Sequence, residues 1–119
     1  MKNIIVTCFF VLMQLGILVQ AQTNTTTDIY QKGQDGYACF RIPAIVQSKA
    51  GTLLAFAEAR KNSCSDTGNI DLVVKRSEDG GKTWSRTITV WDDGDNVCGN
   101  PSPIVDQETG RIILVSCWN

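Results

Sequence analysis

From Phe40 onward the chain is a series of short apolar segments, each followed by a cluster of Gly, Asp, Asn or Ser residues. The segments cover residues 41–47, 52–60, 70–76, 87–91, 101–106 and 111–118. Ile70, Leu72 and Val74 alternate with other side chains at the period of a β-strand, and turn chemistry such as Asp79-Gly80-Gly81 separates the segments. Only Leu53–Arg60 has a composition that favours helix, but its length and its position between Gly51 and a polar loop favour a strand. The pattern predicts an all-β fold.

The strand spacing also predicts the architecture. About four strands per roughly 45 residues is the spacing of a β-propeller blade, so the chain supplies about one and a half blades. Because a meander reverses direction at every turn, alternate loops lie on one face of the propeller, at one end of the strands. This end is expected to collect two arginines, an aspartate and all four cysteines after residue 21. The segments at this end are the entry to the first strand at Arg41, the loop 60–69, residues 98–100 and the end of the last strand at residues 118–119.

The sequence contains no histidine. This excludes a Ser-His-Asp triad, a Cys-His pair and histidine-ligated zinc, so any chemistry must use carboxylates, arginines, hydroxyls or thiols. Eleven basic residues stand against 12 acidic ones without a basic cluster, which argues against nucleic acid as a partner. We expect no metal and no cofactor.

The first 21 residues are expected to be a signal peptide. Lys2 precedes an apolar run from Ile4 to Val19, and small residues at Val19-Gln20-Ala21 suit a cleavage site. A membrane anchor is the alternative, but the run falls short of the roughly 20 clean apolar residues that a bilayer requires. We therefore expect a secreted, periplasmic or cell-surface protein without a membrane span after cleavage. Residues 22–36 are expected to form a linker and lead-in, and 37–119 the folded domain.

Four cysteines follow the signal peptide: Cys39, Cys64, Cys98 and Cys117. An even number in an oxidising compartment indicates disulfides, and four cysteines allow three pairings. Zinc is disfavoured because none of them forms a CxxC pair and histidine is missing. Strand parity places Cys64 and Cys98 in neighbouring loops, so we predict a disulfide between those two.

Ser77-Glu78-Asp79-Gly80-Gly81-Lys82-Thr83-Trp84 matches S-x-D-x-G-x-T-W, the Asp box of propeller hairpins. The members of this motif are Ser77, Asp79, Gly81, Thr83 and Trp84. Asp79 can accept backbone N–H bonds within its own turn, Gly81 can adopt a positive φ, and Trp84 can pack beneath the hairpin. We expect its role to be structural.

An ordered set of motifs then resembles one enzyme family. Phe40-Arg41-Ile42-Pro43, Leu53–Arg60, Asp66, the Asp box and Asn100-Pro101-Ser102-Pro103 occur in this order. Together they resemble the N-terminal part of secreted exo-α-sialidases (neuraminidases) of the bacterial type, across residues 37–119. The resemblance implies a six-bladed propeller and a retaining glycoside hydrolase. Its substrates would be sialylated glycoproteins, glycolipids or oligosaccharides.

The resemblance also implies roles for four residues. Arg41 is similar to the first member of the arginine triad that binds the sialic acid carboxylate, a task suited to the planar guanidinium. Arg60 and Asn100 resemble residues on the 4-hydroxyl side of the pocket. Asp66 resembles the general acid/base that protonates the leaving oxygen.

Part of the family pattern has no counterpart here. The family uses a tyrosine nucleophile paired with a glutamate and two further arginines. Tyr30 and Tyr37 lie in no comparable context, and the same holds for Arg76, Arg86 and Arg111. We therefore expect the chain to be inactive alone. A trans-sialidase and a non-catalytic, glycan-binding Asp-box propeller remain as alternatives.

Overall fold

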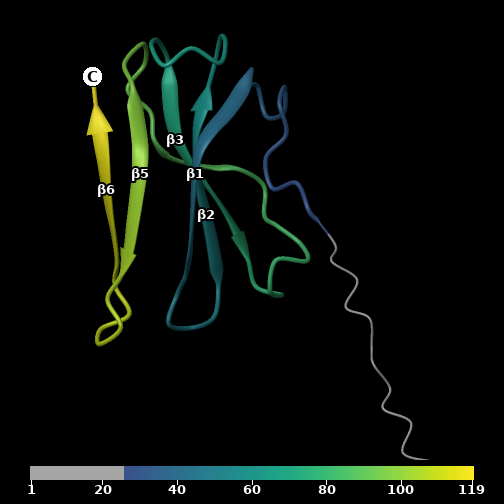
Figure 1. Ribbon diagram of the computed structural model, residues 1–119, viewed down its shortest axis with the longest axis vertical. Helices are drawn as coiled ribbons and strands as arrows, with labels where there is room; N and C mark the ends of the chain where they lie inside the picture. The colour runs from purple at the N-terminus through teal and green to yellow at the C-terminus, as the bar shows by residue number, and fades with distance from the viewer. Residues whose placement is uncertain (1–25) are drawn as a thin grey trace, which may run out of the picture.

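A computed structural model describes residues 26–119 of the chain (Figure 1). The expected signal peptide, residues 1–21, lies outside this part. The strands are β1 (Cys39–Gln47), β2 (Leu53–Arg60), β3 (Ile70–Ser77), β4 (Ile88–Trp91), β5 (Cys98–Val105) and β6 (Ile112–Trp118). Every segment expected to be a strand is one, so the all-β prediction is confirmed. Between residues 26 and 119 no helix has the length and apolar character needed to cross a membrane.

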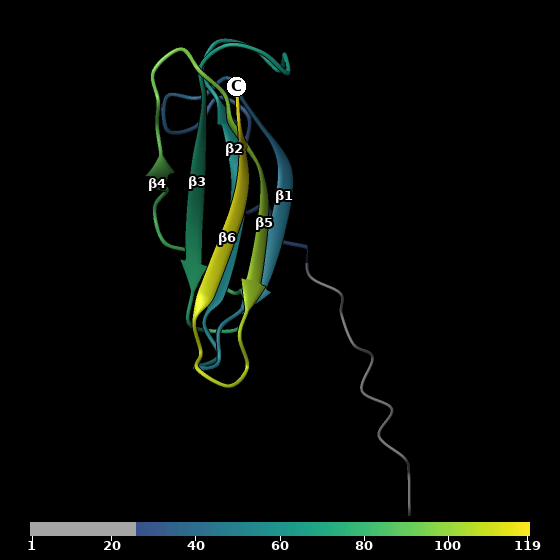
Figure 2. The ribbon, with the colours of Figure 1, turned by 90° about the vertical axis from the view of Figure 1, so that its left-hand side faces the viewer.

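The strands form two antiparallel sheets. β1, β2, β3 and β4 pair in sequence order, and β5 pairs with β6 in a second sheet. Figure 2 shows the β5–β6 pair stacked in front of the larger sheet, and β5 contacts β1, β2 and β3. The meander therefore places the loop between β2 and β3, the start of β5 and the end of β6 at the same end of the molecule, as parity predicts.

The two faces of β2 have different chemistry because successive side chains of a strand point to opposite sides. On one face Ala57 and Ala59 join Val73 of β3 and Tyr37 in the buried apolar cluster. The other face carries Glu58 and Arg60, both buried, and is covered by β5. A charged pair is therefore enclosed between the two sheets.

The segment before β1 packs against the apolar face. Tyr30 stacks on Phe40, with ring centroids 4.8 Å apart, and its hydroxyl donates to the Ala55 carbonyl at 2.7 Å. The Lys75 ammonium donates to the Ile29 carbonyl at 2.9 Å. Part of the stretch 22–36, expected to be a linker, thus contacts the sheet.

β1 and β5 share one irregularity. Each contains an extra residue relative to its partner strand, which forms a β-bulge. In both bulges a non-glycine residue with a positive φ of 52° precedes a proline, at Ile42-Pro43 and at Asn100-Pro101. Proline suits such a position because it has no N–H to leave unpaired. The shared bulge indicates that β5 begins a second copy of the unit that β1 begins.

The hairpin after β3 is closed by the side chain of Asp79. One of its oxygens accepts from the Thr83 N–H at 2.9 Å, and the other accepts from the Thr83 hydroxyl at 2.6 Å. Ser77 donates to Asp79 and accepts from the Gly81 N–H, both at 2.8 Å. Trp84 donates its indole N–H to the Gly81 carbonyl at 3.1 Å. Bonds from Thr83 and Ser77 lower the pKa of Asp79 to about 2.

The predicted disulfide between Cys64 and Cys98 is wrong. Cys64 instead pairs with Cys39, whose Cα lies 5.3 Å away. Strand parity places Cys39 and Cys98 at the same end of the sheet as Cys64. It does not specify the register, which decides which of the two lies next to Cys64. Cys39 lies directly opposite Arg60, where the loop containing Cys64 begins, whereas Cys98 is buried at the start of β5. Burial raises the pKa of the free Cys98 thiol, and Cys117 is free and exposed.

We predict that the 119-residue chain by itself does not form a stable monomer. Ile104, Ile113, Val115 and Trp118 on β5 and β6 are each more than half exposed. In a propeller each blade is covered by its neighbours, and uncovered sheet faces and edges promote association. Size-exclusion chromatography and calorimetry test this, and a cooperative thermal transition of a monomeric sample would contradict it.

The Asp79 hairpin predicts a specific acid sensitivity. Because the pKa of Asp79 is lowered from 3.8 to about 2, its contribution to stability is complete above pH 4 and is lost as the pH falls toward 2. In the full-length protein, Asp79→Asn should lower the free energy of unfolding at pH 6, and the deficit should shrink on going from pH 4 to pH 2. Glu78→Gln, at the exposed neighbouring carboxylate, is the matched control. A deficit that stays constant with pH would contradict the prediction.

Candidate active site

Arg60 is the centre of the polar cluster at the end of β2. Only 3% of its side chain is exposed. Its Nε and Nη2 donate to one oxygen of Glu58 at 3.1 and 2.5 Å, and its Nη1 donates to the carbonyls of Cys64 and Ser65 at 2.6 and 2.8 Å. The same Nη1 lies 2.8 Å from the Asp66 carboxylate. A single buried cation therefore holds both its own strand and the following loop.

Asp66 joins the two arginines. Its Oδ1 lies 2.9 Å from Arg41 Nη1 and 2.8 Å from Arg60 Nη1. The side chains of Asp66 and Arg41 are 76% and 46% exposed, so solvent reaches both. The structure thus brings together three residues that the sequence analysis singled out, from the start of β1, the end of β2 and the loop after it.

The arrangement fixes the charge state of Asp66. The hydrogen bond and charge of Arg60, together with the charge of Arg41, hold the pKa of Asp66 below its ordinary value of 3.8. The pKa of Arg60 is raised, because bonds to Glu58 and Asp66 outweigh the effect of burial. At neutral pH the cluster is therefore an ionised carboxylate between two cations. Acid weakens it only as the pH falls through the lowered pKa of Asp66.

Glu58 is a member of the site that the sequence analysis did not assign. Only 4% of its side chain is exposed, and its second oxygen accepts from the Asn100 N–H at 2.9 Å. Gly99 leaves room for this contact, since a Cβ at that position would lie 2.6 Å from Glu58 Oε1. Glu58 therefore joins Arg60 to the first residues of β5. The signal in the sequence was the placement of Glu58 two residues before Arg60, on the same face of one strand.

Asn100 contributes differently from the two arginines. Its backbone N–H binds Glu58, and the residue as a whole is exposed. Its positive φ is favourable for asparagine, whereas Ile42, next to Arg41, is β-branched and adopts the same φ with strain. Both bulges therefore lie immediately beside the cluster, one after Arg41 and the other at Asn100.

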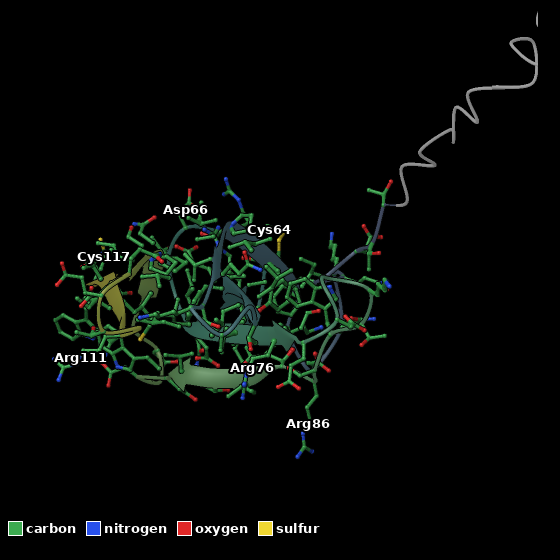
Figure 3. The ribbon with its side chains drawn as sticks, turned by 90° about the horizontal axis from the view of Figure 1, so that it is seen from below. Cys64, Asp66, Arg76, Arg86, Arg111 and Cys117 are labelled. Carbon is green, nitrogen blue, oxygen red and sulfur yellow. A yellow bond between two sulfur atoms is a disulfide. The ribbon has the colours of Figure 1, made fainter. Side chains whose placement is uncertain are left out.

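The other arginines and the two described tyrosines lie apart from the cluster. Figure 3 shows Asp66 and Cys64 on one side of the molecule and Arg76, Arg86 and Arg111 toward the other. Tyr37 donates to the buried Asp71 at 2.6 Å, and its pKa is raised to about 12, first by burial and then by Asp71. Burial also raises the pKa of Tyr30. Both tyrosines pack on the apolar face of the sheet.

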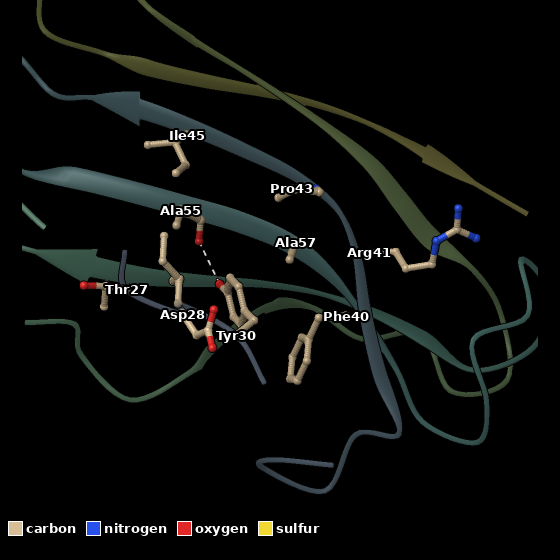
Figure 4. A pocket seen from close by; sticks show the side chains of 10 residues that line it. Thr27, Asp28, Tyr30, Phe40, Arg41, Pro43, Ile45, Ala55 and Ala57 are labelled. Carbon is tan, nitrogen blue, oxygen red and sulfur yellow. Dashed lines mark hydrogen bonds between the residues drawn. The ribbon is translucent and has the colours of Figure 1, made fainter. Parts of the chain in front are cut away.

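A pocket of about 330 Å³ lies on that apolar face (Figure 4). Its walls include Tyr30, Phe40, Pro43 and Ala57, and Arg41 lies at one end. Glu58 and Arg60 project from the opposite face of β2. The pocket therefore adjoins the arginine and carboxylate cluster at Arg41 but does not include Glu58, Arg60 or Asp66.

Comparison with known proteins shows to which family the chain belongs. The exo-alpha-sialidase of Aspergillus fumigatus is 38% identical over 90 residues, which cover 71% of this chain and 22% of that protein. The sialidase of Bacteroides fragilis is 38% identical over 95 residues, which cover 72% of this chain and 18% of that protein. The chain belongs to the sialidase family.

The solved structure of the Hadza microbial sialidase Hz136 extends this result to the fold. It matches with a TM-score of 0.66 at 33% identity, over 72% of this chain and 19% of that one. The sialidase-family chain therefore forms part of a β-propeller. It spans about a fifth of the length of these relatives. No family model matches it.

We predict that Glu58 stabilises the buried charge of Arg60. In the full-length protein, Glu58→Gln preserves shape but leaves Arg60 with the exposed Asp66 as its partner, so the free energy of unfolding should fall by about 3 kcal/mol. Asp66→Asn is the matched control because it removes a carboxylate from the same guanidinium on the exposed side. Its effect in chemical denaturation should be much smaller. Equal losses in the two variants would contradict this assignment.

Proposed function

We propose that the full-length protein is a secreted exo-α-sialidase that releases terminal sialic acid from glycoconjugates with retention of configuration. The observation that carries the proposal is the Asp66 carboxylate held between Arg41 and Arg60 in a chain of the sialidase family. An exposed carboxylate beside two guanidiniums offers an acid/base and an anion-binding site within reach of one ligand.

In this proposal the arginines bind and Asp66 transfers protons. Arg41 receives the substrate carboxylate, and Arg60 and Asn100 line the side of the pocket that faces the sugar 4-hydroxyl. Asp66 protonates the oxygen of the departing glycosidic bond and later removes a proton from water. Glu58 does not touch the substrate and acts by holding Arg60 and the start of β5.

Asp66 cannot act as an acid while both arginines hold it as an anion. Its lowered pKa keeps it ionised at neutral pH. A substrate carboxylate that binds Arg41 competes for the same guanidinium and neutralises its charge. The pKa of Asp66 then rises, so a larger fraction of the protein holds the proton that the acid step requires. Substrate binding thus converts Asp66 from an internal counter-ion into a general acid.

Two further assignments belong to the proposal. Residues 1–21 serve as a signal peptide, which agrees with the Cys39–Cys64 disulfide because disulfides persist in oxidising compartments. The hairpin from Ser77 to Trp84 is an Asp box, a BNR-type repeat whose role is to close the blade. The bonds from Asp79 to Thr83 support this role.

We predict that the effect of removing Asp66 depends on the leaving group. In the full-length enzyme, Asp66→Ala should slow hydrolysis of a sialoside with a sugar leaving group by about 10² or more, because that group departs only when protonated. Hydrolysis of an activated aryl sialoside should slow far less. Steady-state kinetics on the two substrates measure the difference.

Arg41→Ala is the matched variant. It should reduce kcat/KM for both substrates by a similar factor, about 10 to 10², because the substrate carboxylate is present with either leaving group. Equal losses on both leaving groups in Asp66→Ala, or a fully active Asp66→Asn variant, would remove Asp66 from the acid/base role.

A further inference from the structure

Two links between β1 and the loop after β2 lie side by side at the candidate active site. One is the disulfide between Cys39 and Cys64, and the other is the ion pair between Arg41 and Asp66. Both join residues separated by 25 positions, and the second link lies two residues farther along both segments. The start of β1 is therefore joined to the loop 61–69 by one covalent and one ionic link in the same register.

The loop has few other links to the sheet near Asp66. Ser63, Ser65 and Thr67 bond mainly to one another, from Ser65 N–H to the Ser63 hydroxyl and from Thr67 N–H to the Ser65 hydroxyl. Such short-range bonds shape the loop but do not fix its position. The exceptions are the bonds of the Cys64 and Ser65 carbonyls to Arg60.

Cys64 and Ser65 are therefore the residues that attach the loop near Asp66, and Cys64 adds a covalent link to the hydrogen bond. The side chain of Cys64 is bonded to Cys39, which is buried opposite Arg60 in β1, and the carbonyl of Cys64 accepts from Arg60 at 2.6 Å. Asp66, two residues later, is 76% exposed and is held by side-chain ion pairs alone. A carboxylate that must leave the arginines and still reach the substrate needs an anchor other than those ion pairs.

We propose that the Cys39–Cys64 disulfide is a positioning element for Asp66. It keeps the loop over Arg41 and Arg60 when a ligand displaces the Asp66 carboxylate from them. The catalytic part of this inference rests on the proposed function, whereas the effect of the disulfide on the loop does not. The disulfide also stabilises the whole fold by restricting the unfolded chain, so the test has to separate the two effects.

The first part of the test measures how well the loop 61–69 is held in place. In the full-length protein, Cys64→Ser changes an exposed loop residue, and Cys117→Ser, at an exposed free cysteine, is the matched control. Amide hydrogen exchange of residues 61–69 should accelerate about tenfold or more in Cys64→Ser, while β2 and β3 exchange as in the wild type. The control should leave both unchanged. Loop exchange equal to that of the wild type would overturn the proposal.

The second part of the test measures the rate of hydrolysis with two different leaving groups. Cys64→Ser should lower kcat for a sugar leaving group by about tenfold and kcat for an activated aryl sialoside by less than about twofold, with similar KM values, since only proton transfer depends on Asp66. Equal loss on both substrates would show a general structural effect and overturn the proposal. If Cys64→Ser does not fold, limited reduction of the wild-type protein, with the opened pair identified by alkylation, gives the same two readouts.

The outcomes distinguish this inference from the proposed function. If Asp66→Ala shows no dependence on the leaving group, the acid/base role fails, and the exchange data still decide whether the disulfide holds the loop. If Asp66→Ala shows the dependence and Cys64→Ser behaves as the wild type in both parts of the test, the proposed function stands and the positioning role of the disulfide is wrong.

Discussion

The arrangement of the candidate active site, at the end of the sheet where β2 finishes, depends on the buried guanidinium of Arg60. A buried cation is tolerated only when its donors are satisfied and its charge is compensated, and Arg60 meets both conditions through Glu58, two loop carbonyls and Asp66. These partners come from its own strand and from the loop that follows. Glu58 in turn accepts from Asn100 in the second sheet. The position of the loop and the contact between the sheets therefore follow from the need to neutralise one charge.

The same constraint gives Asp66 two possible states. In the structure it is a counter-ion of Arg41 and Arg60, with a pKa held below its ordinary value. If a ligand carboxylate takes its place, the positive charge that acts on Asp66 is reduced, which raises the pKa of Asp66. The site then couples binding of an anion to the supply of a proton. In this account the disulfide at Cys64 matters because it holds the loop independently of the ion pairs.

The strands and the end of the sheet that carries the site could be predicted from the sequence, because both depend on local patterns: apolar segments, turn residues and the parity of a meander. Arg41, Arg60 and Asp66 lie at the same end of the sheet, as that parity predicts, and there they form ion pairs. Features that depend on register could not be predicted. The pairing of Cys64 was wrong because only the register places Cys39 beside the loop. The bulges shift the register of β1 against β2 and of β5 against β6 by one residue, and no periodic pattern in the sequence indicates this shift.

Under the proposed function, the Asp66 carboxylate and a substrate carboxylate compete for the same arginines. The most direct measurement is a ¹³C NMR titration of the Asp66 carboxyl in the full-length protein, with and without a saturating sialic acid analogue that carries the carboxylate. We expect the pKa of Asp66 to lie below 3.8 in the free protein and to rise clearly in the complex. A pKa of Asp66 that is the same in both states, or that falls further on binding, would show that the two carboxylates do not compete.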